Sequence, residues 1–198
     1  MGPGHPIIPM DKTPIFSLLY FVLGASVLAM WIGDLRRAHD GRMRFWPGAT
    51  RANWQSILFA ISGAILLTII ETLFENRLGL REQQQTLPAH YLFAMLGASI
   101  VEEMTFRGFT APENLSGYKL LAVIIFGSAI FVTLHGYGLS DMKGWVSSGS
   151  AFAVSCWLYL SRFNSLNPSR SMIPSLAGHT ARNLAVFGVK AAQGYIVW

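Results

Sequence analysis

Long apolar runs separated by short polar stretches dominate the pattern along this chain. A helix needs about 20 predominantly apolar residues to cross the hydrocarbon core of a bilayer. Irregular backbone cannot face lipid, so helices are the expected spanning form. The pattern therefore predicts an all-α fold, a polytopic transmembrane helical bundle of about six spans. The predicted spans cover residues 15–33, 56–74, 90–109, 119–137, 145–163 and 172–190.

The polar stretches predict how the chain is organised. Residues 1–14 contain four prolines and two glycines and are predicted to form an extended tail. Residues 15–198 show no internal repeat and are predicted to form a single membrane-embedded domain, whose motif-bearing core covers residues 90–190. Five arginines between residues 34 and 53 form the densest basic cluster. The positive-inside rule places this loop in the cytoplasm and the N-terminus outside.

Composition supports an integral, multi-pass membrane protein. The chain of 198 residues is 52% hydrophobic and 13% charged, whereas soluble domains carry about 25% charged residues. Its net charge of +5 could suggest a nucleic-acid partner. However, the basic residues lie mainly in short connections between apolar runs, where they act as topology signals. We therefore expect the lipid bilayer, and no nucleic acid, as a partner.

One predicted span carries three charges within six residues, at Glu102, Glu103 and Arg107. A charge at the centre of a bilayer costs about 2.5–3.5 kcal/mol on insertion scales, so these side chains must face protein, pair together or line a wet cavity. Glu103 and Arg107 are four residues apart and are predicted to pair on one helix face. Glu102 is turned about 100° away and is left to face a cavity. An apolar cavity makes a carboxylate a stronger base. The alternative is a structural ion-pair cluster at a helix end.

Two later spans supply further polar groups. His135 ends one span, four residues after Phe131, and His179 and Asn183 lie four residues apart inside the last span. Hydrogen bonds that hold the bundle together are one explanation. With Glu102, these residues also supply a base, imidazoles and an amide donor, which can activate water and stabilise an oxyanion. No Ser or Cys nucleophile with a neighbouring base stands out, which favours direct attack by water.

Three motifs occur in order on three predicted spans. They are Glu-Glu-x-x-x-Arg (Glu102, Glu103, Arg107), Phe-x-x-x-His (Phe131, His135) and His-x-x-x-Asn (His179, Asn183). Together they resemble the CAAX prenyl protease and bacteriocin-processing family of intramembrane proteases, also called the Abi or type II CAAX protease family. Each motif is weak alone, but three on three hydrophobic spans form a specific signal. The resemblance covers residues 102–183. The shortness of the chain fits a compact bacterial or archaeal member, located in the cell membrane.

The resemblance also implies a role for each motif residue. Glu102 would be the general base that activates water, assisted by His135, and His179 and Asn183 would hold the oxyanion. Supporting residues would be Glu103, Arg107 and Phe131. The resemblance favours a metal-free mechanism with no cofactor. Zinc held by Glu102, His135 and His179 is the alternative, although the sequence has no His-Glu-x-x-His helix.

The sequence thus predicts an intramembrane endopeptidase that hydrolyses a peptide bond near the membrane surface. Its expected partner is a protein or peptide substrate, such as the C-terminal membrane-anchor segment of another protein. One alternative is a non-enzymatic immunity or scaffold protein that binds a peptide. Another is a small transporter with a polar path through Glu102, Glu103, Arg107 and Arg182, although transporters often show internal repeats.

One geometric difficulty concerns the depth of two candidate residues. If the third and fourth spans were straight and antiparallel, Glu102 and His135 would lie on opposite sides of the membrane middle. A tilted or broken helix would bring them together. Gly97, Gly127 and Gly136 are the positions at which the sequence permits bending.

Overall fold

The computed structural model describes residues 13–198, and within them the fold is almost entirely helical. The long helices are α1 (Pro14–His39), α2 (Trp54–Arg77), α3 (Tyr91–Glu103), α4 (Gly117–Leu134), α5 (Met142–Arg162) and α6 (Ile173–Ala192). The shorter elements are the 3-10 helix η1 (Arg81–Gln83), the π-helix η2 (Met104–Phe109), and the strands β1 (Leu87–Pro88) and β2 (Ile196–Val197). Every predicted span coincides with a helical segment, which confirms the all-α prediction.

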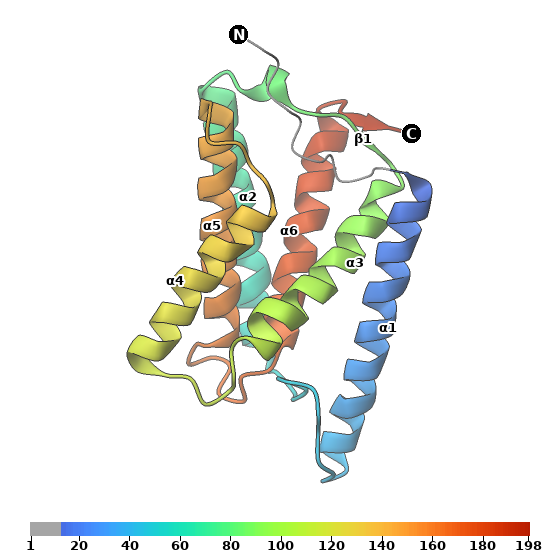
Figure 1. Cartoon of the computed structure of the whole chain (residues 1–198), viewed down its shortest axis with the longest axis vertical. Helices are drawn as coiled ribbons and strands as arrows, with labels where there is room; N and C mark the ends of the chain where they lie inside the picture. Colours follow the sequence, from blue (N-terminus) through green and yellow to red (C-terminus); the bar gives the residue numbers. More distant parts are fainter. Residues whose placement is uncertain (1–12) are drawn as a thin grey trace.

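Successive helices run in opposite directions, so the connecting loops gather at two ends of the bundle (Figure 1). Loops 40–53, 110–116 and 163–172 lie at one end, here called the lower end after its place in Figure 1. Connections 78–90 and 135–141 lie at the opposite, upper end. There β1 pairs with β2 in parallel, with Leu87 opposite Ile196. This small pair, which the sequence did not predict, joins the segment before α3 to the end of the chain.

Three helices are long and apolar enough to cross a membrane: residues 14–38 of α1, 54–77 of α2 and 117–134 of α4. Their outward side chains are large and apolar. Examples are Leu19 on α1, Leu73 on α2 and Phe126 on α4, which are 63%, 61% and 69% exposed. Crossing of the membrane by α3, α5 and α6 stays a prediction.

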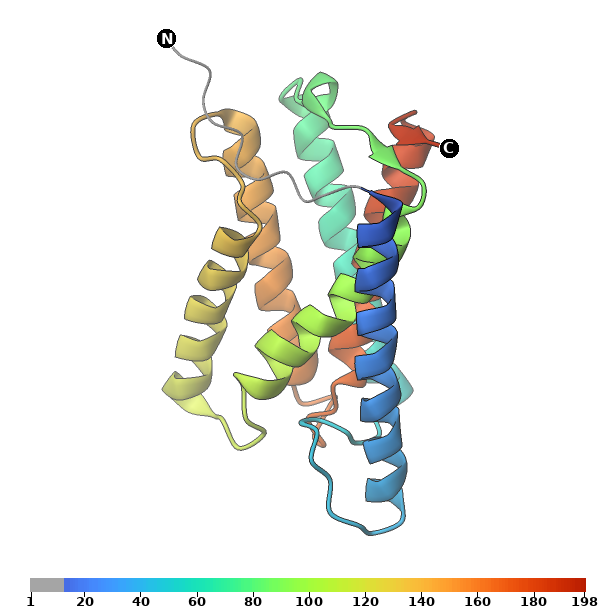
Figure 2. The same cartoon turned by 45° about the vertical axis from the view of Figure 1, so that its right-hand side comes forward.

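The three apolar helices surround the other three. α1 packs mainly against α3, α4 against α5, and α2 against α5 and α6, while α6 contacts both α3 and α5. In both views α1 and α4 lie on opposite flanks of the molecule (Figures 1 and 2). The motif residues of α3, α4 and α6 therefore meet inside the bundle and not on its lipid-facing surface.

Local sequence signals explain where several helices begin. The Thr13 hydroxyl accepts a hydrogen bond from the Phe16 N–H, and Pro14 occupies the first turn of α1, where its missing N–H carries no penalty. Helix α1 therefore begins at Pro14, the last residue of the predicted tail. Residues 1–12 of that tail lie outside the described range. Asn53 and Asp141 cap α2 and α5 in the same way as Thr13.

Small residues allow the helix backbones to approach closely, as is common in membrane bundles. A Cβ atom on Gly97 of α3 would lie 2.1 Å from the Tyr20 carbonyl oxygen of α1. On α2, the buried residues recur every fourth position and are all small: Ser56, Ala60, Ala64 and Thr68. Gly178 of α6 packs against this stripe, because its Cβ position lies 3.2 Å from the Ala60 carbonyl oxygen. These contacts fix α3 and α6, the two helices that carry most motif residues.

Candidate functional site

A fully buried ion pair lies at the centre of the site. The Glu103 Oε1 and Arg107 Nη1 atoms are 3.1 Å apart, and both side chains are 0% exposed. This contact confirms the pairing predicted from their spacing of four residues. A buried charge without a partner is strongly destabilising, so each residue keeps the other in place.

Arg107 is also enclosed by residues that the motif did not include. Its Nη2 atom donates to the Ser155 carbonyl oxygen at 3.0 Å and to the Ser155 hydroxyl at 2.6 Å. The guanidinium carbon lies 4.7 Å from the centre of the Tyr159 ring and 5.0 Å from that of Phe131, within the range of cation–π attraction. Helix α5 thus completes the enclosure of the Arg107 charge, which follows α3 in the chain.

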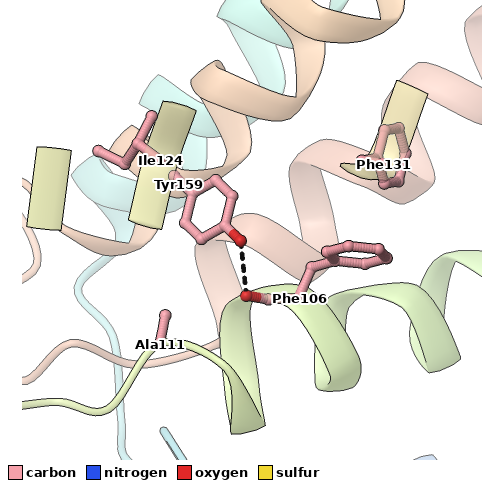
Figure 3. Packing of buried hydrophobic residues seen from close by; sticks show 5 residues of the cluster. All are labelled: Phe106, Ala111, Ile124, Phe131 and Tyr159. Carbon is pink, nitrogen blue, oxygen red and sulfur yellow. Dashed lines mark hydrogen bonds between the residues drawn. The ribbon is translucent and has the colours of Figure 1, made fainter. Parts of the chain in front are cut away.

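The π-helix η2 (Met104–Phe109) presents Arg107 to this enclosure. The wider turn is shown by the Thr110 N–H, which donates to the Thr105 carbonyl oxygen five residues earlier. The Tyr159 hydroxyl donates to the Phe106 carbonyl oxygen at 2.9 Å (Figure 3). Single-turn π-helices are frequent at functional sites, and here the π-helix begins directly after the two glutamates.

His179 lies between the two glutamates and links α6 to α3. Its Nδ1 atom is 2.9 Å from Glu103 Oε1, and its Nε2 atom is 3.6 Å from Glu102 Oε2. Because a carboxylate can only accept, the Nδ1 atom carries the hydrogen of the first contact. The two glutamates differ sharply in exposure, since the Glu102 side chain is 29% exposed and that of Glu103 is 0% exposed. Glu102 is therefore the accessible carboxylate of the pair.

Phe131 and His135 reach the site from the end of α4. The Phe131 ring lies 4.3 Å from the His135 ring and 6.2 Å from the His179 ring. His135 Nδ1 is 2.8 Å from the Phe131 carbonyl oxygen, so Nδ1 again carries the hydrogen, and Nε2 has the lone pair in the neutral ring. No hydrogen bond or ion pair joins His135 to Glu102 in the part of the chain that the structure describes.

The third helix is tilted, which is one of the two arrangements that would reduce the difference in depth between Glu102 and His135. Helix α3 crosses the bundle obliquely in both views (Figures 1 and 2) and becomes a π-helix after Glu103. The Phe131 ring then bridges Arg107 and His135. Of the predicted bending positions, Gly97 serves helix packing, and Gly136, with φ of +64°, turns the chain after α4.

Asn183 lies one turn after His179 on α6. Its Nδ2 atom donates to the Met95 carbonyl oxygen of α3 at 2.8 Å. This bond orients the side-chain amide and uses one of its two hydrogens. Each predicted motif residue thus lies in or beside one cluster. Asn183 is held by its hydrogen bond to the Met95 carbonyl oxygen, and Glu103 by its ion pair with Arg107.

Sequence reasoning missed a second ion pair near this cluster. Arg182 pairs with Glu71 of α2, and its Nη1 atom donates to the Thr68 hydroxyl at 3.1 Å. Arg182 is thus neutralised by α2, and this weakens its proposed place on a transport path. Tyr137 also escaped attention, although its ring stacks on His135 at 5.7 Å.

The zinc alternative needs three ligands in one place. Within residues 13–198, no three His, Cys, Asp or Glu side chains are grouped so as to hold a metal ion. Of the three residues in that alternative, Glu102 and His179 are close together, whereas no described contact joins His135 to either of them. No step proposed below passes through a metal.

The fold and site together define a helical membrane protein with a buried polar centre of carboxylates, imidazoles and an amide. The family model described as "Type II CAAX prenyl endopeptidase Rce1-like" matches residues 84–185, which is more than half of the chain and includes every motif residue. The chain therefore belongs to this family of membrane peptidases. Comparison with curated proteins and with solved structures gave no match.

Proposed function

We propose that this protein is an intramembrane endopeptidase in which Glu102 activates the attacking water. The observation that supports the proposal most strongly is the division between the two glutamates. Glu103 is sealed off and neutralised by Arg107, whereas Glu102 is partly exposed beside His179. A carboxylate that is accessible and does not form an ion pair with an arginine can accept a proton from water.

In the proposed reaction, Glu102 accepts a proton from water as the water oxygen attacks the carbonyl carbon of the scissile bond. The unprotonated Nε2 atom of His135 can accept a hydrogen bond from the same water and help to orient it. General-base catalysis of this kind contributes about 10²–10⁴-fold to the rate.

The tetrahedral intermediate then carries a negative oxygen, for which we assign His179 and Asn183 as donors. The Asn183 amide has one hydrogen left after its bond to Met95. His179 can donate from Nε2 only when this atom also carries a proton, beside Glu102. A single oxyanion donor contributes about 10²–10³-fold. Collapse of the intermediate breaks the carbon–nitrogen bond, and the proton held by Glu102 passes to the leaving amine.

The proposed substrate is a membrane-associated peptide or the C-terminal membrane-anchor segment of another protein. The family description names CAAX prenyl endopeptidases, so a prenylated C-terminal peptide is the second substrate to be tested. Both candidates present a hydrophobic group to the bilayer and a peptide bond near its surface.

The test is cleavage by the purified protein in lipid vesicles, with two fluorogenic peptides. One carries a farnesylated C-terminal CAAX sequence and the other a hydrophobic C-terminal segment. We expect the wild-type protein to cleave at least one peptide, with activity that survives exhaustive chelation. Glu102→Gln is expected to lower the rate by at least about 10²-fold.

Glu82→Gln is the matched control, because Glu82 is exposed in η1 at the upper end. It is expected to cleave at the wild-type rate. If folded Glu102→Gln protein cleaved as fast as wild type, Glu102 would not be the base. If neither peptide were cleaved but one bound equally well to both proteins, the scaffold alternative would be favoured.

A further inference from the structure

The loop at residues 40–53 joins two helices that are each able to cross a membrane. Both ends of such a loop must lie at the same membrane surface. It occupies the lower end of the bundle, together with loops 110–116 and 163–172 (Figure 1). Its position therefore places it beside the lipid headgroups.

Carboxylates and neighbouring loops hold the backbone of this loop in one conformation. The Asp34 carboxylate accepts hydrogen bonds from the N–H groups of Phe45 and Trp46, both at 2.7 Å. The Glu113 carboxylate accepts from the Gly48 N–H at 2.7 Å and pairs with Arg44. Gly48 adopts φ of +61°, which a glycine tolerates best. The loop is thus tied to α1 and to the segment after η2.

Large apolar side chains project outward from this anchored backbone. Met43 and Phe45 are 79% and 72% exposed, and Trp54, at the start of α2, is 65% exposed. Protein contacts do not account for them in the described structure. Apolar and aromatic side chains at this level of a membrane protein are typical of the interfacial region, where tryptophan is enriched.

Four exposed arginines lie in the same loop and at the end of α1. They are Arg36 and Arg37 in the last turns of α1, and Arg42 and Arg51 in the loop. A surface depression lined by Leu35, Arg36, Asp40 and Arg51 lies between the end of α1 and the loop. Two guanidinium groups at one depression offer the bidentate geometry that suits a phosphate group.

The two ends of the bundle differ in charge. The lower end, from the described residues, has eight basic and three acidic residues: Arg36, Arg37, Arg42, Arg44, Arg51, Lys119, Arg162 and Arg170, with Asp34, Asp40 and Glu113. The upper end has four basic and three acidic residues: Arg77, Arg81, Lys143 and Lys190, with Glu75, Glu82 and Asp141. Charge complementarity thus favours anionic lipid at the lower end, because arginines near a membrane surface attract anionic headgroups.

We propose that loop 40–53 and the end of α1 form a binding surface for anionic phospholipid headgroups. Arg36 and Arg51 hold the phosphate group, Arg37 and Arg42 attract the surrounding negative charge, and Met43 and Phe45 insert between the lipids. The rigid backbone presents both kinds of side chain at once, so binding requires no folding of the loop.

The test is native mass spectrometry of the purified full chain in neutral detergent, titrated with phosphatidylglycerol or with phosphatidylcholine of the same acyl chains. We expect the wild-type protein to bind phosphatidylglycerol at least about fivefold more tightly. The variant R36Q/R37Q/R42Q/R51Q is expected to reduce this ratio to about twofold or less. All four side chains are exposed, so the fold should persist, and circular dichroism checks this.

The matched control is R77Q/R81Q, which removes two exposed arginines from the upper end. It is expected to keep the wild-type ratio. The variant M43S/F45S is expected to weaken binding of both lipids and leave their ratio unchanged. A wild-type ratio near one, an unchanged ratio in the fourfold variant, or equal loss in R77Q/R81Q would each overturn the proposal. Because binding is read directly, the result is independent of the proposed peptidase activity.

Discussion

The apolar helices α1, α2 and α4 differ from α3, α5 and α6 in where they place their polar groups. The first three meet the length and hydropathy expected of spans and present side chains such as Leu73 and Phe126 outward. The other three bury groups such as Glu103, Ser155 and His179 against one another. Most polar groups of the site thus come from α3, which is too short to count as a span by itself, and from the less apolar α5 and α6. Polar side chains that satisfy each other inside a bundle do not need to face lipid.

The first prediction is that α5 and α6 cross the membrane. In a Cys156→Ala background, single cysteines at Leu139, Leu166 and Trp198 are labelled with an impermeant thiol reagent in sealed vesicles. We expect Leu139→Cys and Trp198→Cys to react from one side and Leu166→Cys only from the other, because these sites flank α5 and α6.

Met43→Cys and Leu78→Cys serve as controls for this experiment, since they flank α2, whose sequence is fully typical of a span. They should react from opposite sides. Labelling of Leu139→Cys, Leu166→Cys and Trp198→Cys from a single side would show that the bundle has fewer than six spans. In that case α1, α2 and α4 would cross the membrane, whereas α5 and α6 would not.

The second prediction concerns the buried ion pair of the inner helices. Arg107→Met leaves the Glu103 carboxylate without its partner in a site that is 0% exposed. Loss of one partner of a buried pair costs about 3–5 kcal/mol. Unfolding in mixed micelles with increasing sodium dodecyl sulfate should show a destabilisation of this size. The exposed Arg81→Met is the control and should unfold like wild type. Equal stability of Arg107→Met and wild type would remove the structural role assigned to the pair.

The third prediction is smaller and concerns a neutral contact of the same region. Tyr159→Phe removes the hydroxyl that donates to the Phe106 carbonyl oxygen of the π-helix. The expected loss is about 1 kcal/mol, seen in the same micelle titration. Tyr118→Phe is the control, because Tyr118 is 78% exposed at the start of α4. If both variants lost equal stability, the hydrogen bond to η2 would contribute nothing specific.

The sequence allowed several features to be predicted because they follow from local spacing. Six helical segments follow from apolar runs, and the Glu103–Arg107 contact follows from a spacing of four residues. The approach of His179 to both glutamates was not predicted as a contact, although its helix was assigned to the site. Local spacing orients a side chain on its own helix, but it does not determine which helix lies opposite.

Other features depend on tertiary packing and had no local signal. The π-helix arises inside the third predicted span without a spacing that marks it, and the Arg182–Glu71 pair joins residues on separate helices. Of the missed residues, Ser155 was the one that the sequence could most easily have indicated. It belongs to a stripe of buried residues at helical spacing on α5, with Ser148, Ala151, Leu158 and Arg162. Such a stripe of small and polar residues in an apolar helix indicates a face turned toward other helices.

The most direct test of the central claim compares Glu102→Gln with Glu103→Gln for both cleavage rate and stability. We expect Glu102→Gln to lose at least about 10²-fold in rate while its unfolding midpoint stays near that of wild type, since this side chain is partly exposed. Glu103→Gln should lower the unfolding midpoint, because Arg107 and His179 both lose their charged partner. The opposite result, an active Glu102→Gln and a stable but inactive Glu103→Gln, would contradict the assignment of Glu102 as the base.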